Sequence, residues 1–192
     1  MTLKKLTLLF VHGWSVTNTD TYGDLPEKLC LEAQNYGFEI ESKDIVIGRY
    51  VSFQDEVRME DLAIAFGEEI NKITALNPSK NHQIACISHS TGGPIVRIWW
   101  QRWLNTHHKT ANCPIRYFIM LAPANFGSSL IKFGKAQIGH LKSVIEGSEP
   151  GTNILNWLKL GSSASWSLNK EWICSNGRQI SPQGLFPFVL SG

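Results

Sequence analysis

The 192-residue chain predicts a single α/β domain with an open, doubly wound and mostly parallel sheet. Short apolar runs without polar alternation are typical of strands buried on both faces. Segments with helical periodicity separate these runs, as parallel crossovers require. Small and polar residues follow the runs directly, and in such sheets reactive groups gather at the carboxyl ends of the strands.

Five segments are expected to form strands, and three longer segments between them are expected to form helices. The strands are residues 6–11 (LTLLFV), 44–51 (DIVIGRYV), 82–88 (HQIACIS), 115–123 (IRYFIMLAP) and 186–190 (FPFVL). The helices are residues 24–36, with Asp24 as a cap, residues 62–73, which end before Asn77-Pro78, and residues 94–104. The last of these is apolar nearly all round, which indicates a helix packed deep against the sheet.

The chain is expected to divide into a core of residues 1–126, an inserted helical cap or lid of residues 127–178, and a return to the core at 179–192. Serine, glycine and tryptophan increase in the cap around two short amphipathic pieces, 130–145 and 154–160. The cap contains the tryptophans Trp157, Trp166 and Trp172, which either line an acyl pocket, touch a lipid interface or hold the cap together. The role of Phe126 is left open between the same alternatives. Amphipathic spacing alone does not separate these roles.

Charge and cysteine content exclude several classes of protein. Eighteen Lys and Arg face sixteen Asp and Glu, and the basic residues are scattered, so nucleic acid is not an expected partner. The four cysteines lack C-x-x-C spacing, which favours free thiols over a metal site. No stretch is long enough for a membrane span. No cleavage site follows the first apolar run, so no signal peptide is recognised and the cytoplasm is favoured without being fixed.

The segment SHSTGG, residues 88–93, lies between a predicted buried strand and an apolar helix. It resembles the G-x-S-x-G nucleophile elbow of the α/β-hydrolases, with Ser90 as the nucleophile and Gly92 as the closing glycine. Ser88 replaces the first glycine, at a position where the following helix leaves room only for a small residue. The alternative is a glycine-rich turn with a capping serine.

Two further segments carry the same resemblance. FVHGWS, residues 10–15, is similar to the His-Gly loop of lipases and esterases, and LAPANFGSSL, residues 121–130, is similar to their Leu-x-x-Pro-x-x-x-Gly-Ser segment. The chain thus resembles the amino-terminal portion of a lipase- or esterase-like serine hydrolase. The resemblance implies that the backbone N–H groups of Trp14 and Thr91 form an oxyanion hole. His12 is expected to hold the loop and is not assigned as the base.

The implied reaction is acyl transfer to Ser90 followed by hydrolysis of a carboxylic ester, as in a lipase or phospholipase. Amide and thioester substrates stay open, as does peripheral contact with a lipid interface. The mechanism requires no cofactor or metal. A binding or regulatory module that keeps the hydrolase scaffold without catalysis is the competing interpretation.

The acid and the histidine of a catalytic triad follow the serine in α/β-hydrolases. No aspartate follows Ser90, since the last one is Asp61, and His140 with a cap glutamate is a disfavoured substitute. We therefore expect the acid and the base beyond Gly192, after the strand at 186–190. On this interpretation the 192 residues are truncated and nearly inactive alone.

Overall fold

The computed structural model describes residues 4–13, 22–46, 56–78, 82–107, 113–129, 131, 152–176 and 184–191. Their five strands form one parallel sheet in the order β2-β1-β3-β4-β5. The strands are β1 (Lys4–His12), β2 (Phe38–Val46), β3 (Gln83–His89), β4 (Ile115–Leu121) and β5 (Phe186–Leu190). The helices are α1 (Leu25–Asn35), α2 (Met59–Leu76), α3 (Gly92–His107), α5 (Thr152–Leu158) and α6 (Ser163–Lys170), followed by the π-helical segment η4 (Glu171–Asn176).

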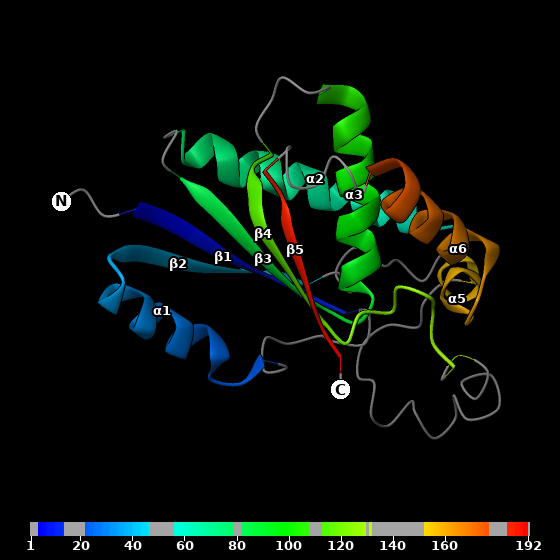
Figure 1. Cartoon of the computed structure of the whole chain (residues 1–192), viewed down its shortest axis with the longest axis horizontal. Helices are drawn as coiled ribbons and strands as arrows, with labels where there is room; N and C mark the ends of the chain where they lie inside the picture. Colours follow the sequence, from blue (N-terminus) through cyan, green and yellow to red (C-terminus); the bar gives the residue numbers. More distant parts are fainter. Residues whose placement is uncertain are drawn as a thin grey trace.

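The helices cover the two faces of the sheet unequally. α1 lies on one face, and α2 and α3 lie on the other (Figure 1). The larger core fills the space under α2 and α3, where Phe66, Trp100 and Phe118 are almost completely buried. A smaller apolar cluster around Phe10 and Ile87 lies on the other face, where Leu29 of α1 packs against it. The continuous apolar runs of β1 and β3 follow from this burial on both faces.

The sequence prediction placed the second strand at residues 44–51, and its start was wrong. β2 begins at Phe38 and pairs with β1 along its whole length. It is an edge strand whose residues alternate between exposed and half-buried until Ile45 and Val46. A search for continuous apolar residues therefore detected only its buried end. Residues 47–51 lie outside the described residues.

The path of the chain places a crossing point between β1 and β3. From β1 the chain passes through α1 to β2 on one side, and α2 then brings it back to β3 on the other side of β1. In open α/β sheets ligands bind outside the carboxyl ends of the strands where the strand order reverses. The carboxyl ends of β1 and β3 are His12 and His89, so Ser90 and Thr91, which follow β3, lie at this point.

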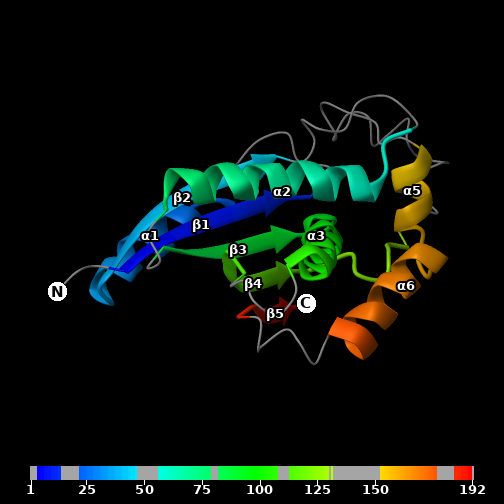
Figure 2. The same cartoon turned by 90° about the horizontal axis from the view of Figure 1, so that it is seen from above.

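The helices between β4 and β5 lie beyond the carboxyl ends of the strands, on the side of α3 (Figure 2). α5 corresponds to the amphipathic piece expected at 154–160, whereas the piece at 130–145 lies outside the described residues except for Ile131. α6 was not predicted because its serine-rich sequence lacks a clear apolar period. Ser162 caps this helix by accepting a hydrogen bond from the Ser165 N–H at 3.2 Å. The division into core and cap stays a prediction.

Among the described helices, none is both long enough and apolar enough to cross a membrane.

Candidate active site

Ser90 occupies a strained turn between β3 and α3. Its φ of 52° lies in the left-handed region, which a residue with a side chain seldom adopts. The Ser90 N–H donates to the Leu121 carbonyl at 3.2 Å, and the Ser90 carbonyl accepts from Gly93 N–H at 3.2 Å and Ala124 N–H at 3.1 Å. Such a conformation costs about 1–3 kcal/mol and persists only where surrounding contacts fix it, as these three hydrogen bonds do.

The glycines after Ser90 allow α3 to start very close to β1 and to the loop after β4. A Cβ on Gly92 would lie 2.7 Å from the Val11 carbonyl oxygen, and one on Gly93 would lie 2.8 Å from Cβ of Pro123. The Gly92 position is also 3.4 Å from Cβ of the fully buried Ser88. The first turn of α3 thus lies directly against β1. This close approach explains why positions 88 and 92 need small residues.

The residue that follows β1 lies against the Ser90 side chain. A Cβ on Gly13 would lie 3.0 Å from Cβ of Ser90 and 3.5 Å from its hydroxyl oxygen. Thr91 follows Ser90 and is 2 % exposed. Trp14, the other expected oxyanion donor, lies outside the described residues, so its N–H is not placed. The structure thus brings Gly13, Ser90 and Thr91 together at one edge of the sheet.

His12 is fully buried and is held by its side chain. Its Nε2 lies 2.8 Å from Oδ1 of Asp44 at the end of β2, and its ring lies edge-on to Tyr22 with centroids 4.8 Å apart. The Tyr22 hydroxyl donates to the Val11 carbonyl at 3.1 Å. Burial, with smaller contributions from Cys86 and Asp44, raises the pKa of Tyr22 well above its usual value, so its hydroxyl stays protonated as a donor. These contacts suit the loop-holding role expected for His12.

His89 directly precedes Ser90, and its environment favours the neutral ring. Burial lowers the pKa of His89, and the nearby His12 adds a smaller contribution in the same direction. Its Nδ1 has no hydrogen-bond partner among the described residues. Ser90 likewise has no hydrogen bond to a histidine in this part of the chain. The described residues therefore supply the serine without a base.

Of the histidines and glutamates that follow Ser90 in the chain, the structure describes His107 and Glu171. His107 is the last residue of α3, and Glu171 is exposed in η4. His108, His140, Glu146 and Glu149 lie outside the described residues.

Metal-binding clusters are also missing from the part of the chain that is described: no group of three His, Cys, Asp or Glu side chains could hold an ion there. All four cysteines are free thiols.

The tryptophans of residues 127–178 have different surroundings. Trp157 is buried in the main core, and Trp172 packs against that core. Trp166 is 58 % exposed, and its ring contacts Phe126, itself 45 % exposed, with centroids 5.4 Å apart. Trp157 and Trp172 therefore hold the segment to the core, whereas Trp166 and Phe126 present apolar surface.

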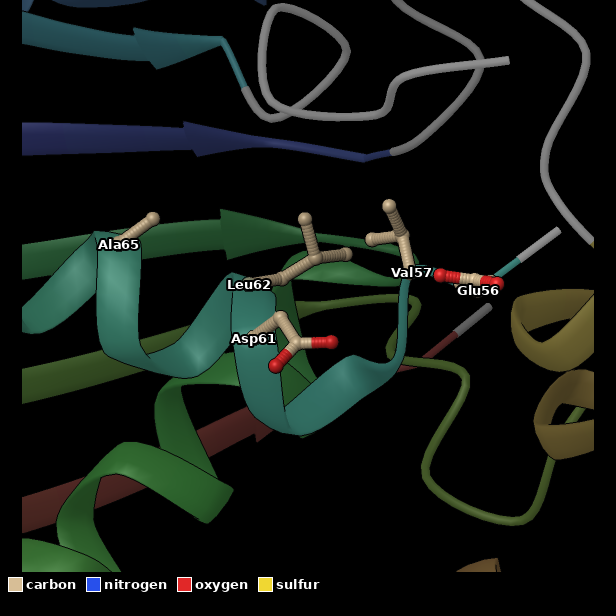
Figure 3. Close-up of a pocket in the computed structure, with 5 residues that line it drawn as sticks. All are labelled: Glu56, Val57, Asp61, Leu62 and Ala65. Atoms are coloured by element: carbon tan, nitrogen blue, oxygen red, sulfur yellow. The ribbon is translucent and has the colours of Figure 1, made fainter. Parts of the chain in front are cut away.

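A pocket of about 370 Å³ opens at the start of α2 and is lined by Glu56, Val57, Asp61, Leu62 and Ala65 (Figure 3). The Asp61 carboxylate accepts a hydrogen bond from Arg58 N–H at 2.9 Å and so serves the start of the helix. None of the expected site residues lines this pocket. The candidate active site is therefore defined by the Ser90 turn and not by this cavity.

Sequence reasoning missed two buried polar residues, Arg97 of α3 and Asn169 of α6. The signal for Arg97 was available, since it is a charged residue in the otherwise apolar segment PIVRIWW. Asn169 carried no signal, because asparagine near the end of a serine-rich helix is expected to be exposed.

The parallel sheet, with Ser90 at its crossing point, has the α/β-hydrolase fold of lipases and esterases. It is similar to phospholipase PlaB from Legionella pneumophila, with 40 % identity and a TM-score of 0.77 over 97 % of this chain. The same phospholipase in complex with thio-NAD gives 38 % identity and 0.72, again over 97 % of this chain. Lipase BlEst2 from Bacillus licheniformis shares the fold, with 16 % identity, a TM-score of 0.63, and coverage of 97 % of this chain and 65 % of that chain.

The chain spans 39 % and 37 % of the length of the two PlaB structures. No protein-family model and no curated protein sequence matches it.

Proposed function

We propose that this chain carries the nucleophile and the oxyanion-binding elements of a serine hydrolase that cleaves carboxylic esters of lipids or other acyl compounds. The observation that carries the proposal is Ser90 at a φ of 52°, with Gly13 against its side chain at the crossing point of the sheet. A strained small residue at this place is typical of a nucleophile elbow, which lifts the hydroxyl toward substrate.

In the proposed reaction Ser90 Oγ bonds to the ester carbonyl carbon while a histidine base takes the hydroxyl proton. The bond to the alcohol then breaks, and the proton passes to the departing alcohol. Water cleaves the acyl-enzyme in the second half and releases the carboxylic acid. The N–H groups of Thr91 and Trp14 stabilise the oxyanion, and one such donor typically contributes about 3 kcal/mol.

The triad acid and histidine are proposed to come from polypeptide outside these 192 residues. Two observations support this: no histidine is hydrogen-bonded to Ser90 within the described residues, and the chain spans 39 % of the similar PlaB structure. Without a base the serine hydroxyl remains protonated and weakly nucleophilic. The 192 residues alone are therefore expected to hydrolyse esters several orders of magnitude more slowly than a form that has the base.

A phospholipid or another lipid ester is the proposed substrate class, in keeping with the names of PlaB and BlEst2. Peripheral contact with a lipid surface is part of this proposal. Phe126, Leu160 and Trp166 are exposed apolar side chains, and Lys159 and Lys170 are exposed nearby in the sequence. Aromatic rings with flanking cations suit a membrane interface.

Labelling with a fluorophosphonate tests the nucleophile in the full-length protein, because this reagent reacts only with an activated serine. We expect one equivalent of label on Ser90 and none in Ser90→Ala, which should also lose ester hydrolysis. Ser42→Ala, which changes an exposed serine of β2, is the matched control and should label normally. Hydrolysis retained by Ser90→Ala would refute the assignment, and a wild type that never labels would favour a non-catalytic binding module. Initial rates on matched ester, thioester and amide substrates define the reaction class.

A further inference from the structure

Arg97 is a buried cation on the helix that follows Ser90. It is 2 % exposed, and it lies five residues after Gly92 in α3, among the apolar side chains of the main core. Burial lowers the pKa of Arg97 to about 10, so the guanidinium is still charged at neutral pH. Arginine is seldom buried to this extent without a specific partner.

The partners of Arg97 come from the segment between β4 and β5. Its Nη2 donates to Oδ1 of Asn169 in α6 at 2.9 Å. Its guanidinium carbon lies 4.7 Å from the ring centroid of Trp172 in η4, within the range of a cation–π contact. One side chain of α3 thus binds both α6 and η4.

Asn169 continues these contacts toward the nucleophile. Its Nδ2 donates to the Asn125 carbonyl at 2.6 Å, and Asn125 lies in the loop after β4. In the same loop the Ala124 N–H donates to the Ser90 carbonyl, and Pro123 packs against Gly93. A continuous series of contacts therefore leads from Arg97 through Asn169 and this loop to the Ser90 turn.

The site of Arg97 is costly for a purely structural contact. Its Nε and Nη1 have no hydrogen-bond partner in the described residues, and no carboxylate among them pairs with it. A buried charge with incomplete pairing destabilises a fold relative to an apolar side chain of similar size. Departures of this kind are expected at functional sites, where position is selected at the expense of stability.

We propose that Arg97 is a positioning residue that fixes α6 and η4 to the loop after β4 and, through that loop, holds the Ser90 turn in place. Its effect on the turn is independent of the proposed function, whereas its effect on ester hydrolysis rests on that function. Arg97 itself touches no reacting atom.

Hydrogen exchange of the full-length protein tests this proposal in Arg97→Met and Asn169→Leu, with Arg102→Met as the control. Met retains an unbranched apolar side chain and removes the guanidinium charge, and Arg102 is an exposed arginine of the same helix. We expect both test variants to exchange at least about tenfold faster in α6, in the loop at 122–125 and at Gly93, with β1 and β3 unchanged. The melting temperature of Arg97→Met should equal or exceed that of the wild type, a result that a merely structural role would not give.

Exchange that rises only in α6, or that rises equally in β1 and β3, would overturn the proposal. Should Arg97→Met fail to fold, Asn169→Leu decides by the same criteria. In parallel, fluorophosphonate labelling of Arg97→Met should slow by about tenfold or more, since a misplacement of about 1 Å can cost up to roughly a hundredfold. A wild type that does not label would refute the proposed function only, because the exchange measurement would still decide the role of Arg97.

Discussion

The Nε2 atom of His12 lies 2.8 Å from Oδ1 of Asp44, and this contact joins the carboxyl ends of β1 and β2. The residue after His12, Gly13, lies against Ser90. His12 is fully buried, whereas the Asp44 side chain is 33 % exposed. The pair therefore fixes the end of β1, where Gly13 lies against Ser90, to the edge strand β2.

Asp44→Ala should destabilise the fold. The substitution leaves Nε2 of His12 buried without a partner, which typically costs about 1–3 kcal/mol. Denaturant titration of the free energy of unfolding measures this loss. Glu39→Ala on the same strand removes an exposed pairing with Lys5 at 3.8 Å and should cost under about 1 kcal/mol. Equal losses of unfolding free energy in the two variants would show that the buried hydrogen bond stabilises the fold no more than the exposed ion pair does.

Ser88→Ala should leave the fold as stable or make it more stable. The hydroxyl of Ser88 is buried and has no hydrogen-bond partner among the described residues. Removing an unsatisfied buried hydroxyl typically gains about 1 kcal/mol, and alanine is equally small beside Gly92. The same denaturant titration checks the result. A loss above about 1 kcal/mol would mean that the hydroxyl has a partner in the folded protein.

Gly92→Ala should destabilise the fold although alanine favours helices over glycine. The new methyl group would meet the Val11 carbonyl oxygen at 2.7 Å, and backbone cannot move aside as a flexible side chain can. Overpacking typically costs about 1–3 kcal/mol, against at most about 1 kcal/mol gained in helix propensity. A melting temperature at or above that of the wild type would show that α3 shifts away from β1 at no cost.

His89 should make the folded protein less stable in mild acid. Because burial and the neighbouring His12 lower the pKa of His89, the unfolded chain takes up a proton near its ordinary pKa of about 6.5 while the folded chain does not. Stability is therefore present above pH about 6.5 and is lost as the pH falls through the lowered folded-state value.

His89→Gln should flatten the decrease in unfolding free energy between pH 7 and pH 5. His107→Gln, which replaces an exposed histidine of α3, is the control. An unchanged slope in His89→Gln would contradict the assignment of this decrease to His89.

Strands buried on both faces were the easiest elements to predict, because β1 and β3 need apolar residues at nearly every position. β2 lacks this constraint over most of its length, since it is exposed at the edge of the sheet, and its start was misplaced by six residues. α6 was missed for a related reason: only Ser165, Leu168 and Asn169 of this helix are buried. Elements that bury more of their surface were therefore predicted more accurately.

The sequence alone determined the parallel α/β class and the position of Ser90, because local patterns encode both: apolar runs mark buried strands, and small residues around a serine mark a tight turn. The tertiary structure decided which distant residues meet. Arg97 and Asn169 are 72 positions apart, and Asn169 and Asn125 are 44 apart. Their contacts depend on how α6 packs on α3, and a single polar residue has no local period that records such packing.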